Sequence, residues 1–226
     1  IYEILGDLHK DKNCIYYDCE KSVEYYNKAL VDNQDAVTAR LSMAKIYSDV
    51  QNQENGHYNL SFAMKQLQLL ETLNNKDIDR NYDRIQMAIS HIYADKNYEG
   101  CDYGKALSAL DKIQSDEKGF IDLQRGNIYA VENSPYYDMK KAVACYTSAA
   151  QKNNTNAMVK LAKCYLYGLG VDRDKEAAKL WLQEADRQGD EYAREYLKNI
   201  DRTSYNPITY TLVKQLLNSL AQSKDK

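Results

Sequence analysis

The sequence predicts an all-α protein, a right-handed α-solenoid of about five to six helix–turn–helix repeats with a C-terminal capping helix. Three observations lead to this prediction. The 226 residues include only 9 Gly and 2 Pro, too few turn residues for a β-sandwich or barrel of this size. Anchor residues recur with a period of 36 in the second half of the chain. An Asp or Asn also stands at the same place in each of five repeats.

The clearest repeat runs from Thr155 to Gly189. Small and apolar residues recur three and four positions apart on each side of Gly168-Leu-Gly170, which predicts a helix, a tight turn and a second helix. Earlier repeats carry the same anchors, with longer loops towards the N-terminus. The aromatic anchors of the first helices are His9, Tyr47, Tyr93, Tyr129 and Tyr165. The small anchors of the second helices are Ser22, Ala63, Ala106, Ala142 and Ala178.

Two further features keep the same register. A small residue stands three positions before each aromatic anchor, on the same helix face, where it lets the second helix approach closely. These small residues are Gly6, Ala44, Ser90, Gly126 and Ala162. Four positions before each second-helix anchor stands a good N-cap, namely Asp18, Asn59, Asp102, Asp138 or Asp174. After the second helices, Asn153 and Gly189 fit a left-handed backbone position.

The repeats are expected to form a single domain over residues 1–226. Their approximate bounds are 1–35, 36–77, 78–116, 117–153, 154–189 and 190–226. Asn206-Pro207 predicts the start of a last helix, because Asn caps well and Pro suits the first helical position. Its apolar residues recur every four positions, which is typical of a helix that covers the exposed face of the final repeat.

Composition argues against several classes of protein. The net charge of −3 and the sequence pI of about 5.7 give no general reason to bind nucleic acid or an anionic membrane. No apolar stretch approaches the roughly 20 residues of a membrane span. The five cysteines include no C-x-x-C pair, so we expect free thiols. The chain starts at Ile1, which suggests a fragment or a processed product. The cytoplasm is favoured, and a periplasmic or secreted location stays open if a leader was removed.

No motif predicts catalysis, a cofactor, a metal or a small-molecule substrate. Gly168-Leu-Gly170 follows a predicted helix, not a strand, and lacks the third glycine of a dinucleotide site. An EF-hand starting at Asp172 would have Ala177 at its sixth position, where that loop needs glycine. The three histidines fit no metalloprotease or nucleophile signature: they are His9, His57 and His91.

The segment from Leu161 to Ala185 resembles a Sel1-like repeat, a family related to TPR proteins. The resemblance rests on Leu161-Ala-Lys-Cys-Tyr165-Leu-Tyr-Gly168-Leu-Gly170-Val171 and on Ala178, Trp181 and Ala185. The first three repeats depart from the family pattern in their loops. The resemblance implies an adaptor that holds another protein and has no catalytic residues. Its members include bacterial signalling, envelope, secretion and host-interaction scaffolds.

Solenoids of this kind bind along the concave surface formed by the first helices. With the small and aromatic anchors facing the core, a helical wheel places a polar stripe on the opposite side. The candidate partner-binding residues on this stripe are Ser42, Lys45, Asp49, His91, Asp95, Gln124, Asn127, Lys160, Lys163 and Tyr167. The stripe also includes Ala88 and Val131. An ordinary solvated helix face is the alternative interpretation.

We therefore expect a protein–protein interaction scaffold with a protein partner of unknown identity, without membrane insertion. Within this class, a bacterial adaptor, a specific inhibitor and an immunity partner stay open. The alternative is an accessory interaction domain cut from a larger enzyme or from an envelope or secretion complex. A standalone enzyme is the third hypothesis, which a buried pocket of converging titratable groups would favour.

Overall fold

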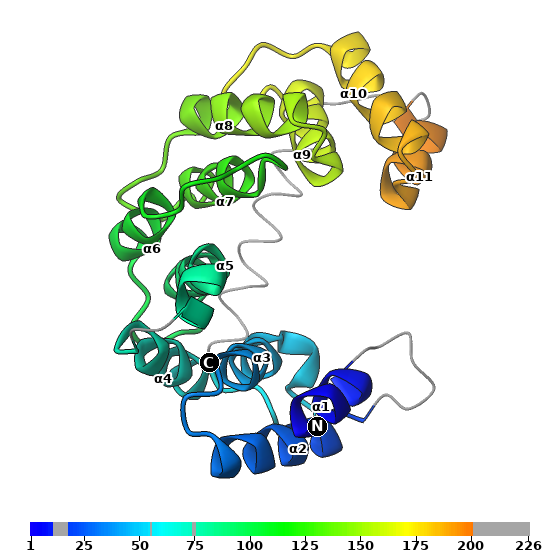
Figure 1. Ribbon diagram of the computed structural model, residues 1–226. Coiled ribbons are helices and arrows are strands. Elements are labelled where there is room, and N and C mark those ends of the chain that lie inside the picture. The colour runs from blue at the N-terminus through cyan, green and yellow to red at the C-terminus, as the bar shows by residue number, and fades with distance from the viewer. Residues whose placement is uncertain (11–17, 55, 74–75, 201–226) are drawn as a thin grey trace. The chain divides into compact units, whose positions relative to one another are not determined.

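The computed structural model of the protein describes residues 1–10, 18–54, 56–73 and 76–200. This part contains eleven α-helices, one short 3₁₀ helix and no strand, which confirms the all-α prediction (Figure 1). The chain divides into two compact units, which are Ile1–Asn154, called unit 1, and the residues from Thr155 onward, called unit 2. The predicted repeat boundary nearest to this division lies between residues 153 and 154, and the repeat bounds stay a prediction.

Unit 1 consists of four helix pairs stacked in chain order. The pairs are α1 (Tyr2–Lys10) with α2 (Cys19–Asp32), α3 (Val37–Ser48) with α4 (Leu60–Glu71), α5 (Lys76–Tyr93) with α6 (Tyr103–Asp111), and α7 (Phe120–Tyr129) with α8 (Met139–Gln151). The 3₁₀ helix η1 (Val50–Asn52) lies between α3 and α4. The described part of unit 2 contains α9 (Thr155–Tyr167), α10 (Lys175–Arg187) and α11 (Glu191–Ile200). Helices of one pair pack more extensively on each other than on the next pair.

The predicted Asp and Asn caps hold the turn of every pair. In each case the side chain accepts a hydrogen bond from the N–H three residues later, at 2.9–3.0 Å. The N–H of the same cap residue donates to the carbonyl of the aromatic anchor in the first helix, at 2.8–3.0 Å. The joined residues are Asp18 and His9, Asn59 and Tyr47, Asp102 and Tyr93, Asp138 and Tyr129, and Asp174 and Tyr165. One residue thus starts the second helix and ties it to the end of the first.

The small residues of the first helices bring the two helices of a pair into close contact, as predicted. All five are buried, and a large buried side chain stands in the second helix four residues after each small anchor. Where the small residue is glycine, this side chain is tyrosine, because a Cβ on Gly6 would lie 2.6 Å from Cε1 of Tyr26. Where it is alanine or serine, the second-helix residue is leucine. The register pairs are Gly6–Tyr26, Ala44–Leu67, Ser90–Leu110, Gly126–Tyr146 and Ala162–Leu182.

The aromatic anchors lie at the margin of the core rather than inside it, since each is half-buried. In three repeats, the third residue of the second helix covers the ring of the aromatic anchor. Phe62 packs on Tyr47 with ring centroids 4.4 Å apart, and Lys105 lies 5.5 Å from the ring of Tyr93. Lys141 lies 5.6 Å from the ring of Tyr129 in the same way. Tyrosine suits such a position, because its apolar ring can pack while its hydroxyl stays in water, and the chain contains 21 tyrosines.

The predictions for the C-terminal part can be compared with the structure only up to Ile200, the last residue that the structure describes. Asn153 and Gly189 have positive φ values of 62° and 91°, as predicted. Ala193 of α11 is buried, in line with the start of a sixth repeat. The predicted capping helix from Asn206-Pro207 lies outside the described residues.

None of the described helices is both long and apolar enough to cross a bilayer. The described cysteines are free thiols: Cys19, Cys101, Cys145 and Cys164.

A candidate protein-binding pocket on unit 1

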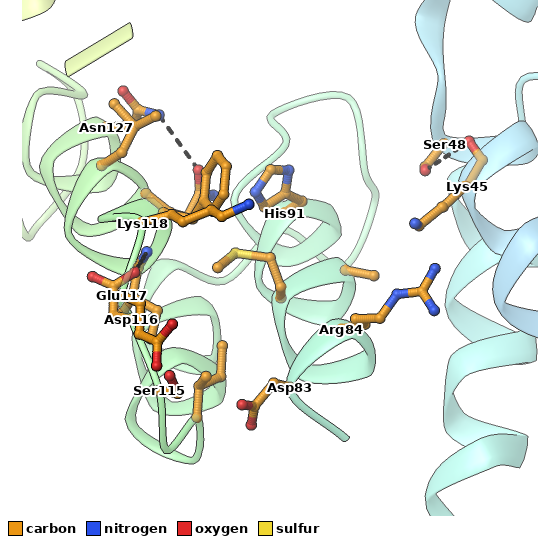
Figure 2. A pocket seen from close by; sticks show the side chains of 17 residues that line it. Lys45, Ser48, Asp83, Arg84, His91, Ser115, Asp116, Glu117, Lys118 and Asn127 are labelled. Atoms are coloured by element: carbon orange, nitrogen blue, oxygen red, sulfur yellow. Dashed lines mark hydrogen bonds between the residues drawn. The ribbon is translucent and has the colours of Figure 1, made fainter. Parts of the chain in front are cut away.

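A pocket of about 570 Å³ opens on the face of unit 1 that α3, α5 and α7 share, called the inner face here (Figure 2). The first helices of three successive repeats line it, together with the loop that joins α6 to α7. Its volume falls within the range of about 300–1,000 Å³ that is typical of binding pockets. The pocket is therefore a product of the repeat architecture, since no single helix pair could form it.

The structure brings four of the predicted binding residues together in this pocket. Lys45 comes from α3, His91 from α5, and Gln124 and Asn127 from α7. The amide Nδ2 of Asn127 donates to Oε1 of Gln124 at 3.4 Å, and Oδ1 of Asn127 accepts from the hydroxyl of Tyr146 at 3.2 Å. Asn127 is thus tied to the helix behind it, while Lys45 and His91 are exposed.

Three other predicted residues have roles within the fold. Ser42 is buried, and its hydroxyl accepts a hydrogen bond from Nζ of Lys10 at 3.0 Å. Asp49 caps η1 by accepting from the N–H of Gln51 at 3.0 Å. Asp95 closes the turn after α5, where its carboxylate accepts from the N–H of Asn97 at 2.8 Å. Asp49 and Asp95, the two acidic residues of the predicted stripe, thus stabilise the start of η1 and the turn after α5.

The remaining predicted residues, Lys160, Lys163 and Tyr167, belong to α9 in unit 2. The ammonium of Lys163 lies 5.4 Å from the ring centroid of Tyr192 and 5.1 Å from that of Tyr196. This cation–π arrangement joins α9 to α11 and makes Lys163 part of the packing of unit 2. Lys160 is exposed. The surrounding protein limits the hydration of its ammonium and thereby lowers its pKa, and repulsion from Lys163 lowers the pKa further.

An apolar floor lies in the pocket, and only one of its residues, Ala88, was on the predicted stripe. It comprises Met87, Ala88, Ile113, Phe120, Ile121 and Leu123. Phe120, the first residue of α7, is 53% exposed although it is one of only two phenylalanines in the chain. Ile113 stands seven residues after the small anchor Ala106, a spacing that predicts the same buried face of the second helix. However, α6 ends at Asp111, and Ile113 lies half-buried in the wall of the pocket. Exposed apolar surface inside a concavity is a common feature of binding sites.

Two cations stand at one end of this floor. The ammonium of Lys45 on α3 and the guanidinium of Arg84 on α5 point towards one another across the space between the two helices (Figure 2). The surrounding protein limits the hydration of the Lys45 ammonium, which lowers its pKa although the residue is exposed, and repulsion from Arg84 and Lys10 lowers the pKa further. The only hydrogen bond of the Arg84 side chain within the described part of the chain joins its Nη1 to Oδ1 of Asn81 at 2.7 Å. This end of the pocket therefore carries uncompensated positive charge.

The wall opposite Lys45 and Arg84 carries acidic groups, several of them held by hydrogen bonds. Asp116 accepts from the N–H groups of Ile121 and Asp122 at 2.9 and 3.2 Å, so it caps α7. Nζ of Lys152 on α8 bridges the carboxylates of Asp116 and Asp122 at 3.0 and 2.8 Å. Burial acts to raise the pKa of Asp122, but hydrogen bonds from Lys152 and Ser148 outweigh it and leave the pKa lowered. Glu117 and Asp83 extend this acidic side.

His91 lies between the two charged ends. The protein that surrounds the pocket limits the hydration of its imidazole, so this desolvation lowers the pKa of His91 below 6.5 and favours the neutral ring near neutral pH. Among the described residues, no group of three or more His, Cys, Asp or Glu side chains is arranged to hold a metal ion. The pocket thus combines an apolar floor with a cationic and an acidic end.

Stacked helix pairs with a pocket lined by their first helices define an α-solenoid of two-helix repeats. Three segments of the chain match the Sel1 repeat model, namely residues 6–30, 131–154 and 155–190. The match to residues 6–30 shows that the first repeat follows the family pattern more closely than its sequence alone indicated. The second and third repeats, which depart in their loops, lie outside the matched segments.

Solved structures of Sel1-repeat proteins share the fold. A protective antigen of uropathogenic Escherichia coli that displays an SLR fold has a TM-score of 0.58 and 18% identity, covering 92% of this chain and 43% of its own. A Sel1 repeat protein from Oxalobacter formigenes has a TM-score of 0.61 and 21% identity, with coverages of 91% and 79%. For a putative Sel1 repeat protein from Klebsiella pneumoniae the values are 0.51, 16%, 88% and 91%. Among curated proteins, none matches the sequence.

Proposed function

We propose that the protein is an interaction scaffold and that the inner face of unit 1 docks a segment of a protein partner. The observation that carries this proposal is the apolar floor, open to solvent and built by three successive repeats. A floor with a half-exposed Phe120 at its edge offers a large side chain of a partner a place to bury its surface. Sel1 repeats generally serve protein–protein interaction, which supports the same conclusion.

The accessory-domain alternative concerns the covalent setting of this site and leaves its chemistry unchanged. The chain spans 43% of the E. coli antigen that shares its fold, so an interaction unit within a longer protein is compatible with the same pocket. In either setting the groups of the pocket act by binding, and the proposal includes no reaction.

The proposal can be tested by placing a photo-crosslinking amino acid at Phe120 in the pocket and, as a matched control, at Leu69. Leu69 is a 37% exposed residue of α4 outside the pocket. In native cells we expect a crosslinked protein at position 120 and none at position 69. The partner so identified is then purified, and its affinity is measured for Phe120→Glu and Leu69→Glu. We expect Phe120→Glu to weaken binding by more than about tenfold and Leu69→Glu to leave it unchanged. Equal effects of the two substitutions would contradict the proposal.

A further inference from the structure

The unpaired cations at one end of the pocket indicate what kind of segment it accepts. Ion pairs satisfy most other basic residues on the helices of unit 1, for example Lys28 with Glu24 at 2.6 Å and Arg125 with Asp111 at 2.7 Å. Lys45 and Arg84 differ, because no carboxylate in the described part of the chain lies within ion-pairing distance of either. Two like charges that face each other repel unless an anion lies between them.

The nearby carboxylate, that of Asp7, is already paired with Lys10. Asp7 is close enough for Arg84 to contribute to its electrostatics. Its Oδ1, however, already accepts hydrogen bonds from Lys10 at 2.6 Å and from the hydroxyl of Tyr26 at 2.7 Å. Asp83 comes next to Arg84 in sequence but points away from it, towards the loop after α6 (Figure 2). Its carboxylate there accepts from the N–H of Gln114 at 3.4 Å.

From this arrangement we infer that the pocket binds a protein segment in which an acidic residue lies next to a large apolar residue. The carboxylate binds between Nζ of Lys45 and the guanidinium of Arg84, whose planar donors suit a carboxylate. The apolar side chain lies on the floor formed by Met87, Ile113 and Phe120. This inference rests on the proposed function, since it names the chemistry of the segment that the same pocket docks.

The acidic end of the pocket further restricts the kind of partner that can bind. On the side opposite Lys45, Asp83 and Glu117 outnumber Lys118, so a uniformly negative polymer such as a nucleic acid would meet net repulsion there. A peptide can place its carboxylate at one end and a neutral or basic residue at the other. The distribution of charge therefore favours a peptide of mixed composition, lying across α3, α5 and α7.

The test is a selection from a display library of random short peptides on the purified full chain, on Lys45→Glu/Arg84→Glu and on a control. Both changed residues are exposed, so the double variant should fold, which circular dichroism verifies. The control, Lys65→Glu/Lys140→Glu, changes the net charge by the same amount on the exposed surfaces of α4 and α8.

We expect the wild-type chain and the control to enrich peptides with Asp or Glu beside a large apolar residue. The Lys45→Glu/Arg84→Glu variant should keep the apolar preference and reverse the charge preference to Lys and Arg. The strongest acidic peptide should lose at least about tenfold in affinity for that variant. Apolar peptides without a charge preference, or an acidic preference that survives the reversal, would overturn this inference and leave the proposed function standing. Absence of any enrichment would overturn both.

Discussion

The pairing of glycine with tyrosine and of alanine with leucine across the repeats predicts a strong coupling between Gly126 and Tyr146. An added Cβ at Gly126 would lie 2.5 Å from Cε1 and 2.7 Å from Cδ1 of Tyr146, a ring that is only 4% exposed. Such overpacking costs about 1–3 kcal/mol. Alanine regains about 1 kcal/mol of helix propensity over glycine. Gly126→Ala alone should thus destabilise unit 1 by up to about 2 kcal/mol.

The compensating change is Tyr146→Leu. Alone it removes a buried ring and the hydrogen bond to Asn127, and it should cost about 2 kcal/mol because a void remains over the glycine. In the double variant the alanine Cβ partly fills that void, which reproduces the pair Ala162–Leu182. We expect the double variant to cost about 1–2 kcal/mol, less than the sum of the two single costs, so that the coupling is about 1–2 kcal/mol.

The assay is urea denaturation followed by circular dichroism for the wild-type chain, both single variants and the double variant. The reverse exchange in unit 2, Ala162→Gly with Leu182→Tyr, is the matched control and should show coupling of the same sign. Costs that add to within about 0.5 kcal/mol at both places would refute the argument, because independent sites add in this way.

Three further predictions follow from single residues. Ser90 is fully buried and, among the described residues, its hydroxyl has no hydrogen-bond partner, so Ser90→Ala should raise the free energy of unfolding by about 1 kcal/mol in urea. Asp174→Ala removes the cap of α10 and should lower it by about 1 kcal/mol, whereas Asp174→Asn should nearly preserve it. The lowered pKa of His91 means that the unfolded chain binds more protons just below pH 6.5, so stability falls as the pH drops there. His91→Gln should lessen the loss of stability between about pH 7.5 and about pH 5.5, and an unchanged loss would contradict this assignment.

The helix pairs could be predicted from the sequence because their signals are local. A cap such as Asp138 and a small residue such as Gly126 each act within a few residues of their own position, and both recur in register. The exchange of tyrosine for leucine over the small position could not be predicted, because it depends on a contact between helices. Its signal was present in the sequence, since Tyr26 and Tyr146 occur in the two repeats that have glycine.

The site was predicted in part. The helical wheel places Lys45, His91 and Gln124 on one face, and the structure brings them into one pocket. The predicted stripe stopped one turn short, because Arg84 lies four residues before Ala88 and Phe120 four residues before Gln124. A wheel extended over the whole helix would have found both.

Other members of the stripe were beyond such reasoning. Burial of Ser42 depends on Lys10 of α1, and the packing of Lys163 depends on two tyrosines of α11. A helical wheel shows which residues share a face, but only the neighbouring helices determine which of them stay accessible.

The central claim is that the inner face of unit 1 is the surface that holds a partner. Methyl NMR spectra recorded while the strongest selected peptide is added test it most directly. The account predicts shift changes for the methyl groups of the pocket floor, namely those of Met87, Ala88, Ile113, Ile121 and Leu123. The exposed methyl groups of Val31 and Leu69, outside the pocket, should not shift. Shifts confined to Val31 and Leu69, with an unchanged floor, would contradict the account.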